Sequence, residues 1–196
     1  MAVPAPTPSA WTAPEGWHAI EFLSDLHLCA DTPRGLEALA AHLRHTDADA
    51  VVLLGDVFEF WVGDDQRSQP FERHCVGLLA EAARLLELGF MPGNRDFLAG
   101  PALQQAIGWR TLADPTLLQA WGRRVLLTHG DALCLADTEY QRFRTLSRGP
   151  AWQRDFLARP LAQRLHQAAL ARAESEARKR ATGVDPALLA DVDRPA

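Results

Sequence analysis

The chain has 196 residues, of which 47% are hydrophobic and 23% charged, a balance typical of a globular domain with a hydrophobic core. No apolar run approaches the roughly 18 residues that span a bilayer, so no transmembrane helix is expected. The three cysteines are far apart and lack CxxC spacing, which argues against a cysteine-based zinc or redox site.

The net charge of −5 is unevenly distributed along the chain. Residues 145–182 hold eight Lys or Arg and three Asp or Glu, which leaves 12 basic and 22 acidic residues for the remainder. An acidic body suits divalent cations, whereas a basic segment suits phosphates or an anionic membrane surface. The alternative for the basic segment is an ordinary solvated helical face.

The first 17 residues contain four prolines and no basic residue. They lack the cationic and apolar regions of a secretory signal, so we predict that residues 1–17 form a flexible leader. Residues 18–196 are predicted to form one domain.

From residue 18 onwards, short apolar runs alternate with helical patterns, which indicates an α/β domain. The expected elements, in chain order, are a strand at 18–23, a helix from 33 to about 45, a strand at 51–54, a helix at 71–88 and a hairpin of strands at 117–121 and 124–128. Only residues 89–92 are left for a strand after the second helix, so we expect the chain to be shortened there.

After residue 150, apolar residues recur at three- and four-residue intervals, and Pro160 interrupts them. The stripe consists of Trp152, Phe156, Leu157, Leu161, Leu165 and Ala169. We predict two amphipathic helices here, within a helical lid at about 145–182. The stripe either packs against the rest of the domain or shelters a lipid.

Four segments share one arrangement, in which an apolar strand leads directly into Asp, His or Asn. They are IEFLSDLHL (20–28), VVLLGDVFEFWVGDD (51–65), MPGNRDF (91–97) and VLLTHGDALC (125–134). Ligands of open α/β sheets bind beyond the carboxyl ends of the strands, so these polar side chains are expected to meet at one edge. Each motif alone is a weak signal, and it is their ordered combination that predicts a site.

The residue types in these segments predict a two-metal centre. Carboxylates, imidazoles and an amide oxygen suit Mn²⁺, Fe²⁺ or Zn²⁺. The candidates are Asp25, His27, Asp56, Asn94 and His129. Asp56 is the natural bridge, because one carboxylate can hold two cations about 3.5–4 Å apart.

The ordered set DxH, GD, GNRD and HGD resembles the calcineurin-like metallophosphoesterase family, whose fold is a four-layer αββα sandwich. The phrases SDLHL, GDVFEFWVGDD, GNRDFL and THGDALCLADTEYQRFR are similar to the UDP-2,3-diacylglucosamine pyrophosphatase branch of lipid A biosynthesis, and the similarity covers roughly residues 20–195. The resemblance implies the αββα fold with a helical lid.

The resemblance also implies roles for individual residues. Asp25 and His27 would bind a first metal ion, Asn94 and His129 a second, and Asp56 would bridge the two. Asp56, Asn94 and His129 would also take part in catalysis. Manganese is the usual metal of the family.

The substrate contacts implied by the resemblance involve Asn94 and five further residues. Arg95 would contact phosphate, because its planar guanidinium group can donate two parallel hydrogen bonds to phosphate oxygens. Asp137 would lie near the glucosamine, and Ser175 would contact the substrate. Lys179 and Arg180 would contact phosphate, although these two positions match the family sequence less closely.

The activity implied is hydrolysis of the pyrophosphate of UDP-2,3-diacylglucosamine to UMP and 2,3-diacylglucosamine 1-phosphate. The implied location is cytoplasmic and peripheral, at the inner membrane that holds this lipid substrate, and no nucleic-acid partner is expected.

One departure from the family pattern concerns its last motif, Gly-His-x-His, which is missing from this sequence. Each metal ion would lack one ligand, and the C-terminal strands of the sandwich are expected to be absent. Three interpretations are consistent with this departure: the chain is a fragment of an active enzyme, a non-catalytic relative, or a metallophosphoesterase with another phosphoester substrate. We favour the first, because the remaining motifs retain their polar residues.

Overall fold

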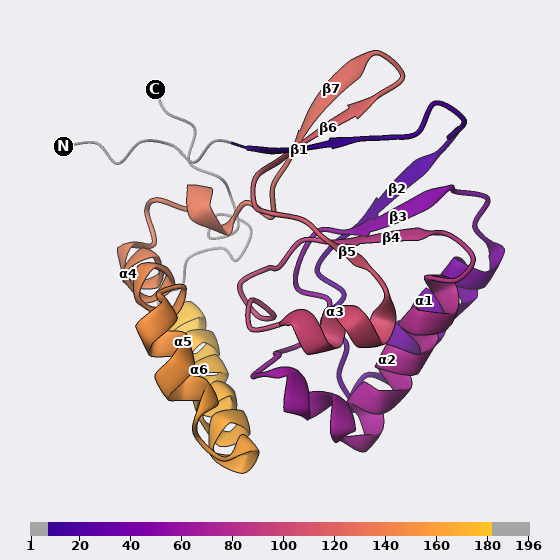
Figure 1. Ribbon diagram of the computed structural model, residues 1–196. Helices are drawn as coiled ribbons and strands as arrows, with labels where there is room; N and C mark the ends of the chain where they lie inside the picture. The colour runs from indigo at the N-terminus through magenta and orange to yellow at the C-terminus, as the bar shows by residue number, and fades with distance from the viewer. Residues whose placement is uncertain (1–7, 182–196) are drawn as a thin grey trace. The chain divides into compact units, whose positions relative to one another are not determined.

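The computed structural model of the protein describes residues 8–181. The chain divides into two compact units, residues 1–129 and residues 130–196. Among the described residues, every strand lies in the first unit, and the second unit is helical (Figure 1).

The larger sheet of the first unit has four parallel strands in the order β2-β3-β4-β5. The strands are β2 (Ile20–Leu23), β3 (Ala50–Leu53), β4 (Glu87–Phe90) and β5 (Arg110–Thr111). All four residues of β3 are fully buried. A parallel strand covered on both faces needs an uninterrupted apolar run, and the sequence AVVL supplies it.

The smaller sheet has the order β1-β6-β7, with β1 (Ser9–Thr12) parallel to β6 (Thr116–Ala120) and β7 (Arg123–Leu127) antiparallel to β6. The predicted hairpin is therefore confirmed. Its turn residues Trp121 and Gly122 have φ angles of 49° and 72°, as a tight two-residue hairpin turn requires.

Strand β1 corrects the prediction of a flexible leader over residues 1–17. Trp11 is only 7% exposed, and its register partner on β6 is Leu118. Ser9 Oγ also lies 2.7 Å from Thr116 Oγ1. The pairing partner follows more than 100 residues later, so local composition alone could not indicate this strand.

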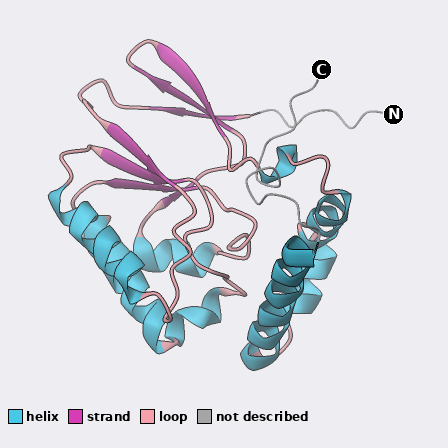
Figure 2. Cartoon of the chain, turned by 180° about the vertical axis from the view of Figure 1, so that it is seen from behind, coloured by secondary structure: helices cyan, strands magenta, loops and turns pink. Residues whose placement is uncertain are grey.

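Three helices cover one face of the larger sheet, and the smaller sheet covers the other (Figure 2). The helices are α1 (Pro33–His45), α2 (Pro70–Ala82) and α3 (Pro101–Ile107), and each has proline in its first turn. Side chains of β3 alternate between the layers: Val51 and Leu53 face the helices, whereas Ala50 and Val52 lie in the cluster between the sheets. These layers correspond to the α, β and β layers of the expected sandwich.

Helix α2 is shorter than the sequence indicated. The helix predicted over 71–88 ends at Ala82, and residues 87–90 form β4. Leu88 pairs with Val51 in the parallel ladder and is 2% exposed, whereas Leu85 is 79% exposed in the connection. The expectation of a shortened chain near residue 89 was therefore wrong, because strand pairing overrides the helical spacing of these leucines.

In its described part, the second unit consists of the short helix η2 (Asp131–Leu133) and the helices α4 (Thr138–Ser147), α5 (Pro150–Leu157) and α6 (Leu161–Ala181). The two helices predicted from the apolar stripe are α5 and α6, whereas α4 was not predicted. Trp152 stacks on Phe156 at 4.7 Å and meets Phe143 of α4 edge-on at 6.1 Å. Among the described residues, no helix is both long and apolar enough to cross a membrane.

Candidate metal centre

The loops that follow β2 and β3 continue side by side beyond the ends of the strands. Asp25 donates its N–H to the carbonyl of Gly55 at 3.1 Å, and His27 donates to the carbonyl of Asp56 at 2.9 Å. The ladder of the sheet is thereby extended into the loops. It fixes the DxH and GD motifs against each other at the carboxyl ends of the strands, as the sequence predicted.

Three candidate ligands have left-handed backbone conformations. The φ angles of Asp25, His27 and Asp56 are 55°, 47° and 55°. This region costs a non-glycine residue roughly 1–2 kcal/mol, so each residue is held there by its surroundings. The backbone bonds between the two loops supply that restraint.

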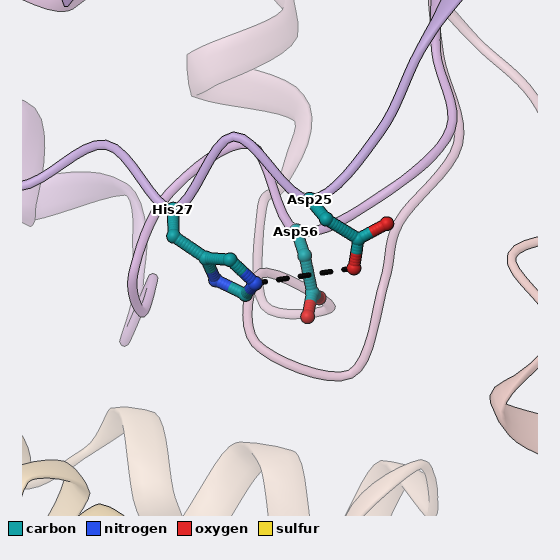
Figure 3. Close-up of side chains that lie close together, drawn as sticks. All are labelled: Asp25, His27 and Asp56. Atoms are coloured by element: carbon teal, nitrogen blue, oxygen red, sulfur yellow. Dashed lines mark ion pairs between the residues drawn. The ribbon is translucent and has the colours of Figure 1, made fainter. Parts of the chain in front are cut away.

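The side chains of Asp25, His27 and Asp56 lie together, as Figure 3 shows. One ligand atom from each lies within 4.8 Å of the others. His27 Nε2 is 3.9 Å from Asp25 Oδ1, and both carboxylates lie on the same side of the imidazole (Figure 3). Two carboxylates and one imidazole form a donor set that suits a divalent transition-metal ion.

His129 and Asn94 approach Asp56 as a second pair of candidates. His129 Nε2 is 3.1 Å from Asn94 Oδ1 and 3.7 Å from Asp56 Oδ1. Its other nitrogen, Nδ1, lies 2.8 Å from the carbonyl oxygen of Leu54. A carbonyl only accepts, so Nδ1 carries the hydrogen in the neutral ring and Nε2 presents a lone pair. Three acceptor atoms then converge, an arrangement that a cation satisfies.

Burial, together with the nearby carboxylate of Asp96, raises the pKa of Asp56 to about 6. The N–H of Arg95 and the imidazoles of His129 and His27 oppose this shift. The Arg95 N–H donates to Asp56 Oδ1 at 2.9 Å. A divalent cation would be the largest local charge and would favour the ionised carboxylate.

Asp96 holds the loops of the site through hydrogen bonds to their backbone, and it was not among the sequence candidates. It is fully buried, and it accepts N–H bonds from Val57 at 2.7 Å, Gly93 at 2.8 Å and Asp56 at 3.3 Å. Burial raises its pKa, and these backbone bonds oppose the shift. The signal that could have identified it is the last residue of the GNRD phrase, which follows a strand as the ligands do.

Two glycines let the loops approach closely. A Cβ on Gly93 would overlap Asp56 Oδ1 and lie 2.5 Å from the Asp56 nitrogen. A Cβ on Gly55 would overlap His129 Nδ1 and lie 2.7 Å from the Cα of Gly93. Gly55 also has a φ of 90°, which L side chains rarely adopt. The GD and GNRD motifs therefore need glycine for contact with each other.

Arg95, the predicted phosphate contact, lies beside these ligands. Its Nη1 is 2.6 Å from Glu59 Oε1 and its Nε is 3.8 Å from Asp56 Oδ2. Glu59 was not among the site residues predicted from the sequence. The arginine side chain is 29% exposed, so its guanidinium can still be reached from solvent.

The remaining predicted site residues belong to the second unit. Asp137 caps α4, where its side chain accepts the N–H of Tyr140 at 3.0 Å. Ser175, Lys179 and Arg180 lie on α6, at positions whose side chains are outside the described residues. The substrate roles of these four residues stay predictions.

The fold and the converging acceptors are those of a metal-dependent phosphoesterase. Residues 19–179 match the family model of the calcineurin-like phosphoesterases, and the chain belongs to that family. The family implies divalent metal ions, for which Asp25, His27 and Asp56 offer a possible site.

Two relatives show where in the family the similarity lies. A UDP-2,3-diacylglucosamine hydrolase of Chromobacterium violaceum is 48% identical over 170 residues, covering 85% of this chain and 70% of the relative. A protein of the same name from Xanthomonas campestris pv. campestris is 46% identical over 160 residues, covering 81% of this chain and 65% of the relative. The chain thus spans about two thirds of the length of these curated relatives.

Among solved structures, the phosphoesterase Yfce from E. coli is 25% identical over 57% of each chain. Its TM-score is 0.35.

Proposed function

We propose that this protein hydrolyses the pyrophosphate bond of UDP-2,3-diacylglucosamine, releasing UMP and 2,3-diacylglucosamine 1-phosphate in lipid A biosynthesis. The observation that carries the proposal is the convergence of Asp25, His27, Asp56, Asn94 and His129 at the carboxyl ends of the strands. The specific substrate is supported by relatives at 46–48% identity that carry the name UDP-2,3-diacylglucosamine hydrolase.

The proposed cofactor is a pair of Mn²⁺ ions. Asp25 and His27 would hold one, Asn94 and His129 the other, and Asp56 would contact both. When bound, such ions polarise phosphoryl oxygens and stabilise the charge that develops on them. The mixed oxygen and nitrogen donors fit manganese, because no thiolate takes part.

The chain itself would orient the ligands and the phosphate. The Arg95 N–H fixes one oxygen of Asp56, and the Leu54 carbonyl fixes the tautomer of His129. The guanidinium of Arg95 would bind a phosphate oxygen through charge-assisted hydrogen bonds. Asn94 would bind the substrate beside its metal, and Asp137, Ser175, Lys179 and Arg180 would provide the remaining contacts.

The proposed location is the cytoplasmic face of the inner membrane, with the protein bound peripherally. Support comes from the basic segment at 145–182 and from the lipid in the names of the relatives. Vesicle sedimentation would test it: binding to anionic vesicles should fall with rising salt, and equal binding to neutral vesicles would contradict the charge argument.

The direct test is UMP release from UDP-2,3-diacylglucosamine by the purified chain with Mn²⁺. Asp56→Asn should lower the rate at least about 100-fold, since losing an outer partner of a metal ligand already costs 10–100-fold. Glu87→Gln serves as the control, because Glu87 pairs with Arg110 on β4 and β5 at 2.9 Å, apart from the ligands. A folded wild-type chain that binds Mn²⁺ but releases no UMP would refute this substrate.

A further inference from the structure

Glu59 occupies a position between two loops of the site. It is 8% exposed, and its N–H donates to the carbonyl of Leu28 at 3.1 Å, within the loop that carries His27. Two residues later, the N–H of Trp61 donates to the carbonyl of Arg95 at 2.9 Å. The backbone around Glu59 is therefore joined to the loop of a metal-ligand candidate and to the loop of the phosphate-binding arginine.

The two carboxylate oxygens of Glu59 face different partners. Oε1 lies 2.6 Å from Arg95 Nη1, and Oε2 lies 3.8 Å from His27 Nδ1. The other ring nitrogen of His27, Nε2, faces Asp25 Oδ1 at 3.9 Å. The imidazole thus directs Nε2 toward the candidate metal ligands and Nδ1 toward Glu59.

This orientation is what a metal-binding histidine needs. When one ring nitrogen binds a cation, the other carries the hydrogen, and a carboxylate that accepts this hydrogen fixes the tautomer and makes the ring a better ligand. Glu59 Oε2, at 3.8 Å from Nδ1, is the charged acceptor on that side of the ring and would come within hydrogen-bond distance after a small side-chain movement. The same carboxylate holds the guanidinium of Arg95, whose flexible side chain would otherwise sample several rotamers. One residue can therefore align the metal ligand and the phosphate-binding group together.

We propose that Glu59 is a positioning residue which orients His27 for metal binding and Arg95 for phosphate binding. The inference rests on the proposed function for the role of Arg95, whereas its metal-binding half requires only that the protein binds a divalent cation. Glu59 does not contact the reacting atoms in this scheme. It acts through its two partners.

A purely structural ion pair is the competing explanation. The pair Glu87–Arg110 provides the comparison, because it is also a close glutamate–arginine ion pair, with Glu87 Oε1 on β4 lying 2.9 Å from Arg110 Nε on β5. Both of its partners are exposed, at 36% and 53%, and neither is a candidate ligand. A structural pair should affect unfolding alone, whereas a positioning residue should also affect metal affinity.

The decisive experiment measures the Kd for Mn²⁺ by calorimetry in wild type, Glu59→Gln and Glu87→Gln, with thermal unfolding to establish that each is folded. Glu59→Gln keeps the shape of the side chain and removes its charge. We expect it to weaken Mn²⁺ binding 10–100-fold and Glu87→Gln to change it less than about twofold. The electron paramagnetic resonance spectrum of bound Mn²⁺ should also change in Glu59→Gln alone.

A second readout concerns Arg95. At saturating Mn²⁺, Glu59→Gln and Arg95→Gln should each lower kcat/KM, and the double variant should be no worse than Arg95→Gln, because the two residues act as one unit. If Glu59→Gln does not fold, Glu59→Asp replaces it: the shorter carboxylate cannot reach both partners and should also weaken Mn²⁺ binding.

The outcomes separate the two claims. A folded Glu59 variant with a Mn²⁺ Kd within twofold of wild type overturns the positioning role. A wild-type chain that binds Mn²⁺ without releasing UMP refutes the proposed substrate, while the ratio of Kd values still decides the role of Glu59. A wild-type chain that does not bind Mn²⁺ overturns both.

Discussion

Replacing Gly93 with alanine should damage the site by steric overlap alone. The new Cβ would overlap Asp56 Oδ1 and come within 2.5 Å of the Asp56 nitrogen. Rotating the Asp56 side chain could relieve the first contact but not the second, because the nitrogen belongs to the backbone. The φ angle of Gly93 lies outside the left-handed range, so no conformational strain adds to the effect.

The expected cost has two parts. Overpacking a filled position costs about 1–3 kcal/mol. Moving Asp56 also weakens the bond that its carboxylate accepts from the Arg95 N–H at 2.9 Å, and a hydrogen bond to a charged group contributes about 1.5–3 kcal/mol. Together they predict a loss of roughly 3 kcal/mol or more, which corresponds to a fall in Tm of roughly 6–12 °C for a chain of this length.

The assay is thermal unfolding with and without Mn²⁺, and the control is Gly77→Ala. Gly77 lies in α2 with nothing within 4 Å of the position its Cβ would take. Alanine there should raise the free energy of unfolding by up to about 1 kcal/mol, because glycine is the poorer helix former. The same substitution thus has opposite effects at the two sites. A Gly93→Ala variant with unchanged Tm and Mn²⁺ affinity would show that the loops do not meet as described.

Three further predictions concern stability. Asp64→Ala should lower the free energy of unfolding in urea by about 1–2 kcal/mol, because the Asp64 carboxylate accepts three N–H groups at the start of α3 at 2.8–3.1 Å; an unchanged midpoint would contradict this. Hydrogen bonds from the N–H groups of His18 and Ala19 lower the pKa of Asp49. The difference in Tm between wild type and Asp49→Asn should therefore be largest above about pH 5 and should shrink as the pH falls below the usual aspartate range. A difference in Tm that stays constant with pH would refute this prediction. Removing metal with EDTA should lower Tm, and Mn²⁺ at 100 times its Kd should raise the free energy of unfolding of the metal-free protein by about 2.7 kcal/mol. A Tm that responds to neither EDTA nor Mn²⁺ would exclude metal binding by the folded state.

Much of the site could be predicted because its residues directly follow strands. Parallel strands end at the same edge of a sheet, so the order of DxH, GD, GNRD and HGD was enough to predict that the side chains meet. The structure confirms that proximity for Asp25, His27 and Asp56, and for Asn94 with His129. Their roles as ligands stay proposals, because proximity does not establish binding.

What the sequence could not reveal depends on partners distant in the chain or on weak local signals. Strand β1 exists because it pairs with β6, and α2 ends at Ala82 because the following residues pair with β3. Helix α4 has the polar sequence TEYQRFRTLS, in which apolar periodicity is faint. The role of Glu59 depends on the loop ladder, since spacing from Asp56 alone does not show which side chains it faces.

The paired carboxylates of Asp56 and Asp96 explain why this edge of the sheet suits cations. Asp96 accepts backbone N–H groups from both loops, those of Asp56 and Val57 in one and of Gly93 in the other, so it holds the loops together. The burial of Asp56 itself and the nearby charge of Asp96 raise the pKa of Asp56, which makes an ionised Asp56 costly without a counterion. The carboxylate of Asp96 therefore fixes the loops, while its charge disfavours the ionised form of Asp56. A divalent cation at Asp56 would offset that cost, so metal binding and the stability of these loops should be coupled.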